Sequence, residues 1–296
     1  MTRIVLAYPL WLGGSEPFDD DGIAWLGEQH AAEVVTLMLD VGQGRALEAL
    51  RDRALTAGAV RAHVLDVADE FAGRFVLPTL RAGALHRDGR SNALGLARMI
   101  VAQKLVEVAG IEQTTTVAHG YADHDRRIAT AVRTLDHRLA VIPLPPAIAA
   151  STPAPTDPPA PAAAGASEAA FVELTFARGQ PTAINGVAMP LTDLIGSIDM
   201  LVRKSPATIV LHGAHRGLQE SVIADPSELQ SIARQYSELI DTGAWFSPAR
   251  QELDAVVDEV EQRVSGTVRL QLSSDACRIV EIKPLEEIER KVEVRT

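Results

Sequence analysis

The chain has 296 residues, of which 47% are hydrophobic and 23% are charged, and its formal net charge is −11. This length can hold two modest domains, or one large domain with a linker, and the composition is ordinary for a globular protein. The acidic charge argues against nucleic acid or an anionic membrane as a partner, because both would repel it. The only cysteine, Cys277, excludes an internal disulfide and a cysteine-based zinc site.

The first residues, MTRIVLAYPLWLGG, predict a short buried strand followed by a loop, and they do not resemble a signal peptide. No apolar stretch of the sequence is long enough to cross a bilayer. We therefore expect a cytoplasmic protein that has no membrane partner.

Residues 1–142 alternate short apolar runs with amphipathic segments, which is the pattern of an α/β domain with a doubly wound parallel sheet. Ligands of such sheets bind beyond the carboxyl ends of the strands. The expected strands are 4–8, 33–40, 63–67, 114–118 and 139–143, and the expected helices are 22–30, 46–57, 95–109 and 126–135.

Residues 143–170, PLPPAIAASTPAPTDPPAPAAAGASEAA, offer few side chains that could form a core, and their prolines lack backbone donors. This composition predicts an extended linker. A proline-rich recognition motif is the alternative interpretation.

Residues 171–296 predict an α+β domain with tight turns, one of them at Asn185-Gly186. The charged tail from Leu285 predicts either an exposed helix or an arm over a neighbouring subunit. The expected strands are 171–176, 179–184 and 205–212, the expected helices are 227–242 and 248–264, and a hairpin joins 267–272 to 277–282.

Five segments carry a family resemblance that covers most of the chain outside the linker. They are TLMLDVGQG at 36–44, ARMIVAQKLVEVA at 97–109, VAHG at 117–120, GAWFSP at 243–248 and RVSGTVRL at 263–270. In this order they resemble argininosuccinate synthase. The resemblance implies an adenine-nucleotide α-hydrolase-like domain followed by a synthetase and tetramerisation domain, in a homo-oligomer that is a dimer or a tetramer. It also implies that ATP, with magnesium, adenylates the ureido oxygen of citrulline and that aspartate then displaces AMP.

In this family a Ser-Gly-Gly-Leu-Asp-Thr-Ser loop follows the first strand and grips the pyrophosphate of ATP. Here Ala7-Tyr8 matches the strand end, but Pro9 follows and removes a backbone donor. Gly13-Gly14-Ser15 is either a displaced remnant of the loop or an ordinary turn. The acidic run at 19–21 either binds a divalent cation or caps a helix. The resemblance thus implies a weakened site for ATP and magnesium. The residues that would line it are Ala7, Tyr8, Gly13, Gly14 and Ser15.

Two further matches concern the nucleotide. In the family the backbone just before the aspartate of DVGQG lies against the adenine, which makes Leu39 the corresponding residue here. The match at Ala118-His119-Gly120 likewise implies that Gly120 lines the nucleotide site. The alternative for DVGQG is a strand-to-helix turn that only preserves the fold.

The positions that bind amino acids in the family are less well matched. Arg127 aligns with the arginine that holds the citrulline carboxylate, and Arg98 either contacts substrate or pairs with a carboxylate of the frame. Leu94 stands where the family has a threonine, so a hydrogen-bonding hydroxyl is missing. The run at 123–125, Asp-His-Asp, is interpreted as a solvated polar loop, with a metal or acid–base cluster as the alternative. The linker replaces the family segment that encloses citrulline. We assign no metal ligand and no catalytic residue.

We therefore interpret the chain as a family member that has lost citrulline–aspartate ligation and has been repurposed, either as a small-molecule enzyme or as a non-catalytic scaffold. One alternative is an ATP-dependent, AMP-forming C–N ligase with other amino-acid substrates. Another is a non-catalytic partner subunit of a full-length paralogue.

Overall fold

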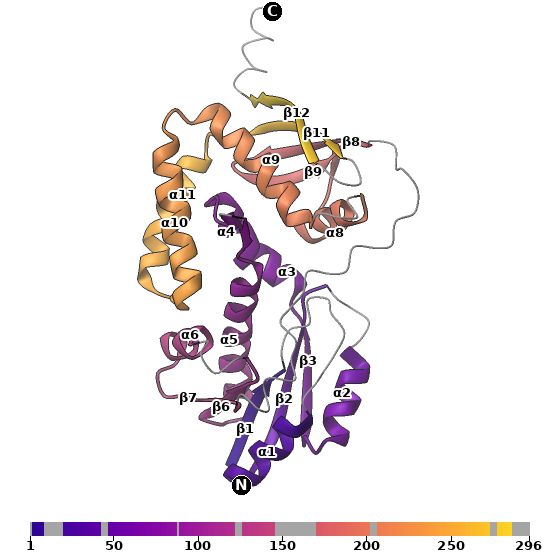
Figure 1. The fold of residues 1–296 in the computed structure, drawn as a ribbon, viewed down its shortest axis with the longest axis vertical. Coiled ribbons are helices and arrows are strands. Elements are labelled where there is room, and N and C mark those ends of the chain that lie inside the picture. Colours follow the sequence, from indigo (N-terminus) through magenta and orange to yellow (C-terminus); the bar gives the residue numbers. More distant parts are fainter. Residues whose placement is uncertain are drawn as a thin grey trace, which may run out of the picture. The chain divides into compact units, whose positions relative to one another are not determined.

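The computed structural model forms two compact units, each built from segments that alternate along the chain (Figure 1). Unit 1 comprises Met1–Phe71, Leu94–Pro159 and Leu239–Ser247, and unit 2 comprises Ala72–Ala93, Ala160–Glu238 and Pro248–Thr296. The residues that the structure describes are 2–8, 20–42, 47–87, 89–121, 126–145, 170–201, 206–272 and 277–285. The predicted linker, except at its ends, and the tail beyond Leu285 lie outside them.

A five-stranded parallel sheet forms the centre of unit 1, in the order β3-β2-β1-β6-β7. The chain adds β2 and β3 on one side of β1 and then β6 and β7 on the other, which confirms the predicted doubly wound topology. The strands are β1 (Thr2–Ala7), β2 (Ala32–Asp40), β3 (Arg61–Asp66), β6 (Thr116–His119) and β7 (Ala140–Pro143).

Side chains on both faces of the central strands are buried, because helices cover both faces of this sheet. Ile4 and Leu6 of β1 join one apolar cluster with α1 and α2, while Val5 and Val35, on the opposite face, are also fully buried. The longest helix, α5, is buried along most of its length. The helices of unit 1 are α1 (Asp20–His30), α2 (Leu47–Thr56), α3 (Ala68–Phe71), α5 (Ala93–Ile111) and α6 (Arg127–Leu135).

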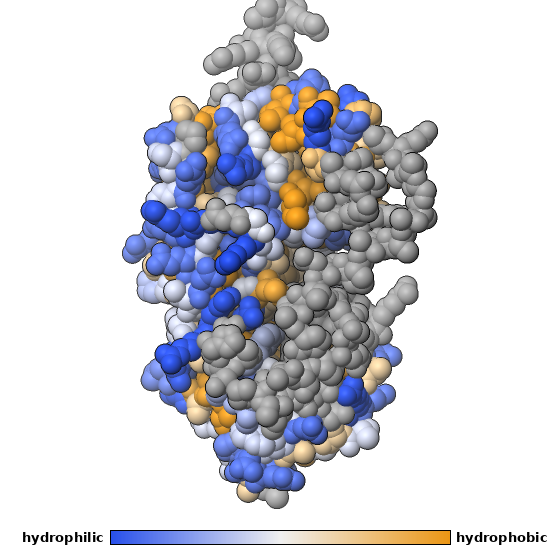
Figure 2. All heavy atoms as spheres, viewed as in Figure 1, coloured by the Kyte–Doolittle hydropathy of each residue, from blue (hydrophilic) through white to orange (hydrophobic). Residues whose placement is uncertain are grey.

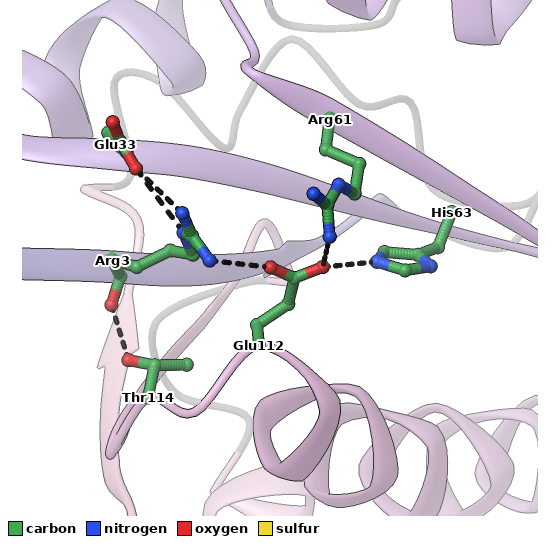
Figure 3. A network of polar contacts seen from close by, with 6 residues as sticks. All are labelled: Arg3, Glu33, Arg61, His63, Glu112 and Thr114. Atoms are coloured by element: carbon green, nitrogen blue, oxygen red, sulfur yellow. Dashed lines mark hydrogen bonds and ion pairs between the residues drawn. The ribbon is translucent and has the colours of Figure 1, made fainter.

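A charged network closes the end of the sheet where the strands begin, and we call it the amino edge (Figure 3). Its residues are Arg3, Glu33, Arg61, His63 and Glu112. Glu112, directly after α5, is buried and accepts hydrogen bonds from Arg3 Nη1 at 2.9 Å and Arg61 Nη1 at 2.8 Å. His63 Nε2 lies 2.7 Å from the same carboxylate. Burial alone would raise the pKa of Glu112, but the hydrogen bonds and charges of His63 and Arg61 outweigh it and hold this pKa below its ordinary value.

Unit 2 contains a five-stranded antiparallel sheet in the order β10-β9-β8-β11-β12. The predicted hairpin turn at Asn185-Gly186 is confirmed, and both of its residues have positive φ, as the tightest hairpin turns require. The strands are β8 (Ala170–Ala177), β9 (Gln180–Ile184), β10 (Val187–Ala188), β11 (Gly266–Leu272) and β12 (Cys277–Pro284), with a separate short hairpin of β4 (His86–Arg87) and β5 (Arg90–Ser91).

The prediction of a strand at 205–212 is wrong, because helix α9 (Ala207–Val222) includes the residues from Ala207 onward. Ile209-Val210-Leu211 is a short apolar run that suits a buried strand by itself. The apolar positions then continue with helical spacing at Ala214 and Leu218, both of which are buried. The amide of Ala207 donates to Asp199 Oδ1 at 2.7 Å, which provides an acceptor at the start of the helix.

Five further helical segments lie among the described residues of unit 2. They are η1 (Ala72–Val76), α4 (Leu77–Arg81), α8 (Leu191–Leu201), α10 (Pro226–Thr242), whose last residues belong to unit 1, and α11 (Pro248–Glu261). Figure 2 shows a mostly hydrophilic surface over α10 and α11, whereas hydrophobic residues gather over the antiparallel strands. In the part of the chain that the structure describes, no helix is both long enough and apolar enough to span a membrane.

Candidate functional site

The carboxyl ends of β1, β2 and β6 lie side by side in unit 1. Ala7, at the end of β1, pairs with Leu37 of β2 on one side and with His119 of β6 on the other. The amide of Tyr8 then donates to the carbonyl of Leu37 at 2.9 Å. Because the strand order reverses at β1, this is the position where doubly wound sheets bind their ligands. We call these strand ends, together with Arg98 and Arg127, the carboxyl edge.

The end of β2 is held by a turn that Asp40 stabilises. Asp40 Oδ1 accepts a hydrogen bond from the amide of Gly42 at 2.8 Å, and the Asp40 carbonyl accepts one from the amide of Val67 at 2.8 Å. Gly42 has a φ of +108°, a conformation that glycine adopts readily. Leu39 is buried just before this turn. Asp40 and Gly42 therefore have a role in the fold, and the contact of Leu39 with adenine stays a prediction.

An aromatic and cationic group follows the end of β6. His119 and Gly120 are buried, and the ring of Tyr121 lies 6.1 Å from the ring of His119. Arg98, on α5, places its Cζ atom 5.5 Å from the centre of the Tyr121 ring, which is the distance of a cation–π contact. The structure thus brings Arg98 to the strand end that contains Gly120.

Arg127 begins α6 and lies beside the segment Leu239–Ser247. Its Nη1 atom is 3.9 Å from Asp241 Oδ1, and the two side chains are 33% and 64% exposed. An exposed pair of this kind contributes at most about 1 kcal/mol to stability. The contact between Arg127 and Asp241 can therefore be exchanged for a contact with a ligand.

Two glycines allow the segment Leu239–Ser247 to approach α5 and α6 closely. A Cβ atom built on Gly95 would lie 2.3 Å from Ile240 Cγ2, and one built on Gly243 would lie 2.3 Å from the carbonyl oxygen of Arg127. Gly243 also has a φ of +77°. Trp245, in the GAWFSP segment, is buried within the chain itself.

The predicted site residues fall into two groups. The structure brings Ala7, Tyr8, Leu39 and Gly120 to neighbouring strand ends, and it places Arg98 and Arg127 on adjoining helices. Gly13, Gly14, Ser15 and the run at 123–125 lie outside the described residues. Among the residues that are described, no group of three or more His, Cys, Asp or Glu side chains could hold a metal ion.

Sequence analysis did not single out Tyr121 or Asp241 as site residues. The position of Tyr121, directly after the Ala-His-Gly strand end, was the available signal. Asp241 gave none, because it lies on an exposed helix end far from Arg127 in the sequence.

Two family descriptions match the chain. Residues 3–148 match the arginosuccinate synthase N-terminal HUP domain, and residues 201–288 match the arginosuccinate synthase C-terminal domain. The first match extends into the start of the predicted linker at 143–170, and the second begins after the linker's end.

Curated relatives are similar over nearly the whole chain. Argininosuccinate synthase of Streptococcus agalactiae serotype Ia is 30% identical over 94% of this chain and 87% of the relative. The enzyme of the same name from Desulfitobacterium hafniense strain DCB-2 is 29% identical over 96% of this chain and 88% of the relative. The one from Carboxydothermus hydrogenoformans is 30% identical over 91% of this chain and 85% of the relative.

Proposed function

We propose, from the premise that this chain belongs to the argininosuccinate synthase family, that it no longer joins citrulline to aspartate and that its carboxyl edge serves another small molecule. The adenine half of the nucleotide site is retained in this proposal. What has changed is the set of groups that would hold the phosphates and the two amino acids.

The contact between Arg98 and Tyr121 carries the proposal. The resemblance places Arg98 near the amino-acid substrate, whereas here its guanidinium lies over the ring of Tyr121. Such a contact is worth roughly 0.5–2 kcal/mol, which a substrate carboxylate would have to replace. The ring also takes up space beyond the end of β6, where a ligand of this fold would lie.

A leucine at a substrate-binding position points the same way. Leu94, one residue before Gly95 on α5, stands where the family has a threonine. A polar substrate that binds against leucine leaves hydrogen-bonding groups without a partner, which costs about 1–3 kcal/mol for each buried group. The loss of this hydroxyl thus disfavours citrulline in particular.

The described residues fit an adenine better than they fit a triphosphate. Ala7, Leu39 and Gly120 supply buried main chain and apolar side chains at the strand ends, where a flat base can pack. The described arginines of the same edge already contact protein groups, Arg98 the ring of Tyr121 and Arg127 the carboxylate of Asp241, so these contacts would have to open before either arginine could bind a phosphate. We therefore expect a nucleotide with fewer phosphates, such as AMP, to bind better relative to ATP than in a full synthase.

A coupled assay tests the proposal. The full chain is incubated with ATP, magnesium, citrulline and aspartate while pyrophosphate release is followed, with the Carboxydothermus hydrogenoformans enzyme as the positive control. We expect no release above that of a protein-free control, although calorimetry detects AMP binding. Release that requires both citrulline and aspartate would overturn the proposal.

The exposed pair of Arg127 and Asp241 favours a second candidate, an AMP-forming C–N ligase with other amino-acid substrates. Arg127 can leave Asp241 at little energetic cost and bind a ligand carboxylate bidentately. Pyrophosphate release with some other pair of amino acids, lost in the variant Arg127→Gln, would support this candidate over the first.

A further inference from the structure

A cavity of about 550 Å³ lies within unit 2. This volume is in the range of small-molecule sites. Three stretches of chain form its wall: the turn from α4 to β4, the second half of α9 and the start of α10. The lining residues are Gly83, His86, Arg87, Arg216, Gln219, Glu220, Ser227, Leu229, Gln230, Ser231, Ala233 and Arg234.

The lining of this cavity is positively charged in a protein that is strongly negative overall. Arg87, Arg216 and Arg234 face a single acidic residue, Glu220, whereas the whole chain has a net charge of −11. Arg216 and Glu220 form an exposed ion pair at 2.8 Å, which contributes little energy and can open. Arg234 forms no ion pair with the residues that the structure describes. The cavity therefore concentrates guanidinium groups against the general charge of the molecule.

Hydrogen bonds hold one lining residue of the cavity, Gln219, in place. Gln219 is buried, and its Nε2 atom donates to Glu261 Oε1 at 2.6 Å and to the carbonyl of Arg81 at 3.0 Å. Glu261 in turn lies 2.9 Å from His215 Nε2, and neither of these side chains is exposed to solvent. Groups that are fixed before a ligand arrives lose little conformational entropy on binding, which favours affinity.

Two imidazoles, that of His86, which lines the cavity, and that of His212 beside it, do not supply the positive charge of the cavity. His86 Nε2 lies 3.1 Å from Thr208 Oγ1, and its ring is 5.6 Å from that of His212. Burial lowers the pKa of His86, and burial, followed by the charges of His86, His215 and Arg216, lowers the pKa of His212 to about 4. At neutral pH both rings are therefore uncharged, and the three arginines define the ligand chemistry.

We propose that this cavity binds a small molecule that carries phosphate or carboxylate groups, at a second site distinct from the carboxyl edge of unit 1. Guanidinium groups bind these oxyanions bidentately. The hydroxyl of Ser231, near the start of α10, is a further donor at the rim, whereas Ser227 already bonds to the carboxylate of Asp225.

The test is calorimetric titration of the full chain with two probes, inorganic pyrophosphate for phosphate ligands and citrate for carboxylate ligands, at constant ionic strength. The cavity variant is Arg87→Gln/Arg234→Gln. A matched control, Arg263→Gln/Arg278→Gln, removes the same charge from arginines of unit 2 that do not line the cavity. A third variant, Arg98→Gln/Arg127→Gln, removes the arginines of the carboxyl edge. Circular dichroism and thermal melting establish that each variant is folded.

We expect at least one probe to bind, and the cavity variant to weaken that binding tenfold or more, because two charge-assisted contacts are lost. The control and the carboxyl-edge variant should change the affinity by less than twofold. Binding of pyrophosphate alone would identify a phosphate ligand, and binding of citrate alone a carboxylate ligand. No saturable binding of either probe at millimolar concentration, or binding lost only in the carboxyl-edge variant, would overturn the proposal. The pyrophosphate-release assay with citrulline and aspartate concerns the carboxyl edge of unit 1. Neither a positive nor a negative result of that assay decides whether this cavity binds an anion.

Discussion

The two edges of the parallel sheet use their charged residues differently. At the amino edge, the Glu112 side chain is 1% exposed and lies within hydrogen-bonding distance of Arg3, Arg61 and His63 (Figure 3). At the carboxyl edge, Arg127 and Asp241 are one third and two thirds exposed, and their atoms are 3.9 Å apart. Removing one member of a buried charged network leaves the other charges uncompensated and is strongly destabilising, whereas exposed pairs contribute little and exchange partners easily. The amino edge therefore stabilises the fold, whereas the exposed pair at the carboxyl edge can exchange partners.

The largest effect should come from Glu112. The substitution Glu112→Gln removes the charge that the arginines and His63 contact, and it should lower the free energy of unfolding by about 2–3 kcal/mol. Nucleotide binding at the opposite edge should stay unchanged, as measured by calorimetry. The control is Glu107→Gln on the neighbouring helix α5, where the carboxylate is 45% exposed and pairs with Lys104. Urea denaturation should show a loss of less than about 1 kcal/mol for this control. Equal losses of unfolding free energy in Glu112→Gln and Glu107→Gln would contradict the claim that the amino edge stabilises the fold more than an exposed pair does.

Acid should remove the same stabilisation. The pKa of Glu112 is lower in the folded protein than in the unfolded chain, so its contribution to stability is present above the ordinary pKa of glutamate and is lost as the pH falls through the folded value. The stability gap between the wild-type protein and Glu112→Gln should therefore narrow below about pH 4. Urea denaturation of both proteins between neutral and acidic pH measures this gap. A gap that is constant with pH would show that Glu112 acts through packing alone.

A smaller effect is expected from Tyr121 at the carboxyl edge. The variant Tyr121→Leu removes the aromatic face under Arg98 and should cost about 0.5–1 kcal/mol of stability, while Tyr121→Phe keeps the face and should cost less. Denaturation measures both losses. Releasing Arg98 should also change ligand affinity at this edge, and calorimetry with AMP detects it. If the leucine and phenylalanine variants are alike in both measurements, the contact with Arg98 has no energetic importance.

The smallest effect should come from Asp241. Because its pair with Arg127 is exposed, Asp241→Asn should change the free energy of unfolding by less than about 0.5 kcal/mol. Chemical denaturation at low and high salt provides the measurement. A loss comparable to that of Glu112→Gln would mean that the carboxyl edge is held as firmly as the amino edge.

The sequence predicted the parallel sheet well because local signals determine it. The strands of unit 1 are short apolar runs that alternate with helical segments, and this alternation predicts a doubly wound parallel sheet, whereas the order of its strands follows from the structure. The error at α9 has a local cause as well: the run Ile209-Val210-Leu211 fits a strand until Ala214 and Leu218 extend the helical spacing.

The amino edge could not be predicted in the same way. Arg3, Arg61 and Glu112 are single charged residues far apart in the sequence, and only the register of β1, β2 and β3 brings them together. The contact of Arg98 with Tyr121 depends similarly on how α5 packs beside β6. Sequence analysis identified Arg98 through its family position, but the partner of its side chain follows from tertiary structure alone.

One measurement tests the central claim most directly. The full chain is incubated with ATP, magnesium, aspartate and citrulline labelled with heavy oxygen at the ureido position, and the AMP that forms is analysed by mass spectrometry. In the family reaction the ureido oxygen leaves with AMP, so the Carboxydothermus hydrogenoformans enzyme should produce labelled AMP. We predict that this chain produces no labelled AMP, although we expect it to bind AMP. Labelled AMP formed by this chain would contradict the account, because it would show that citrulline is still activated at the carboxyl edge.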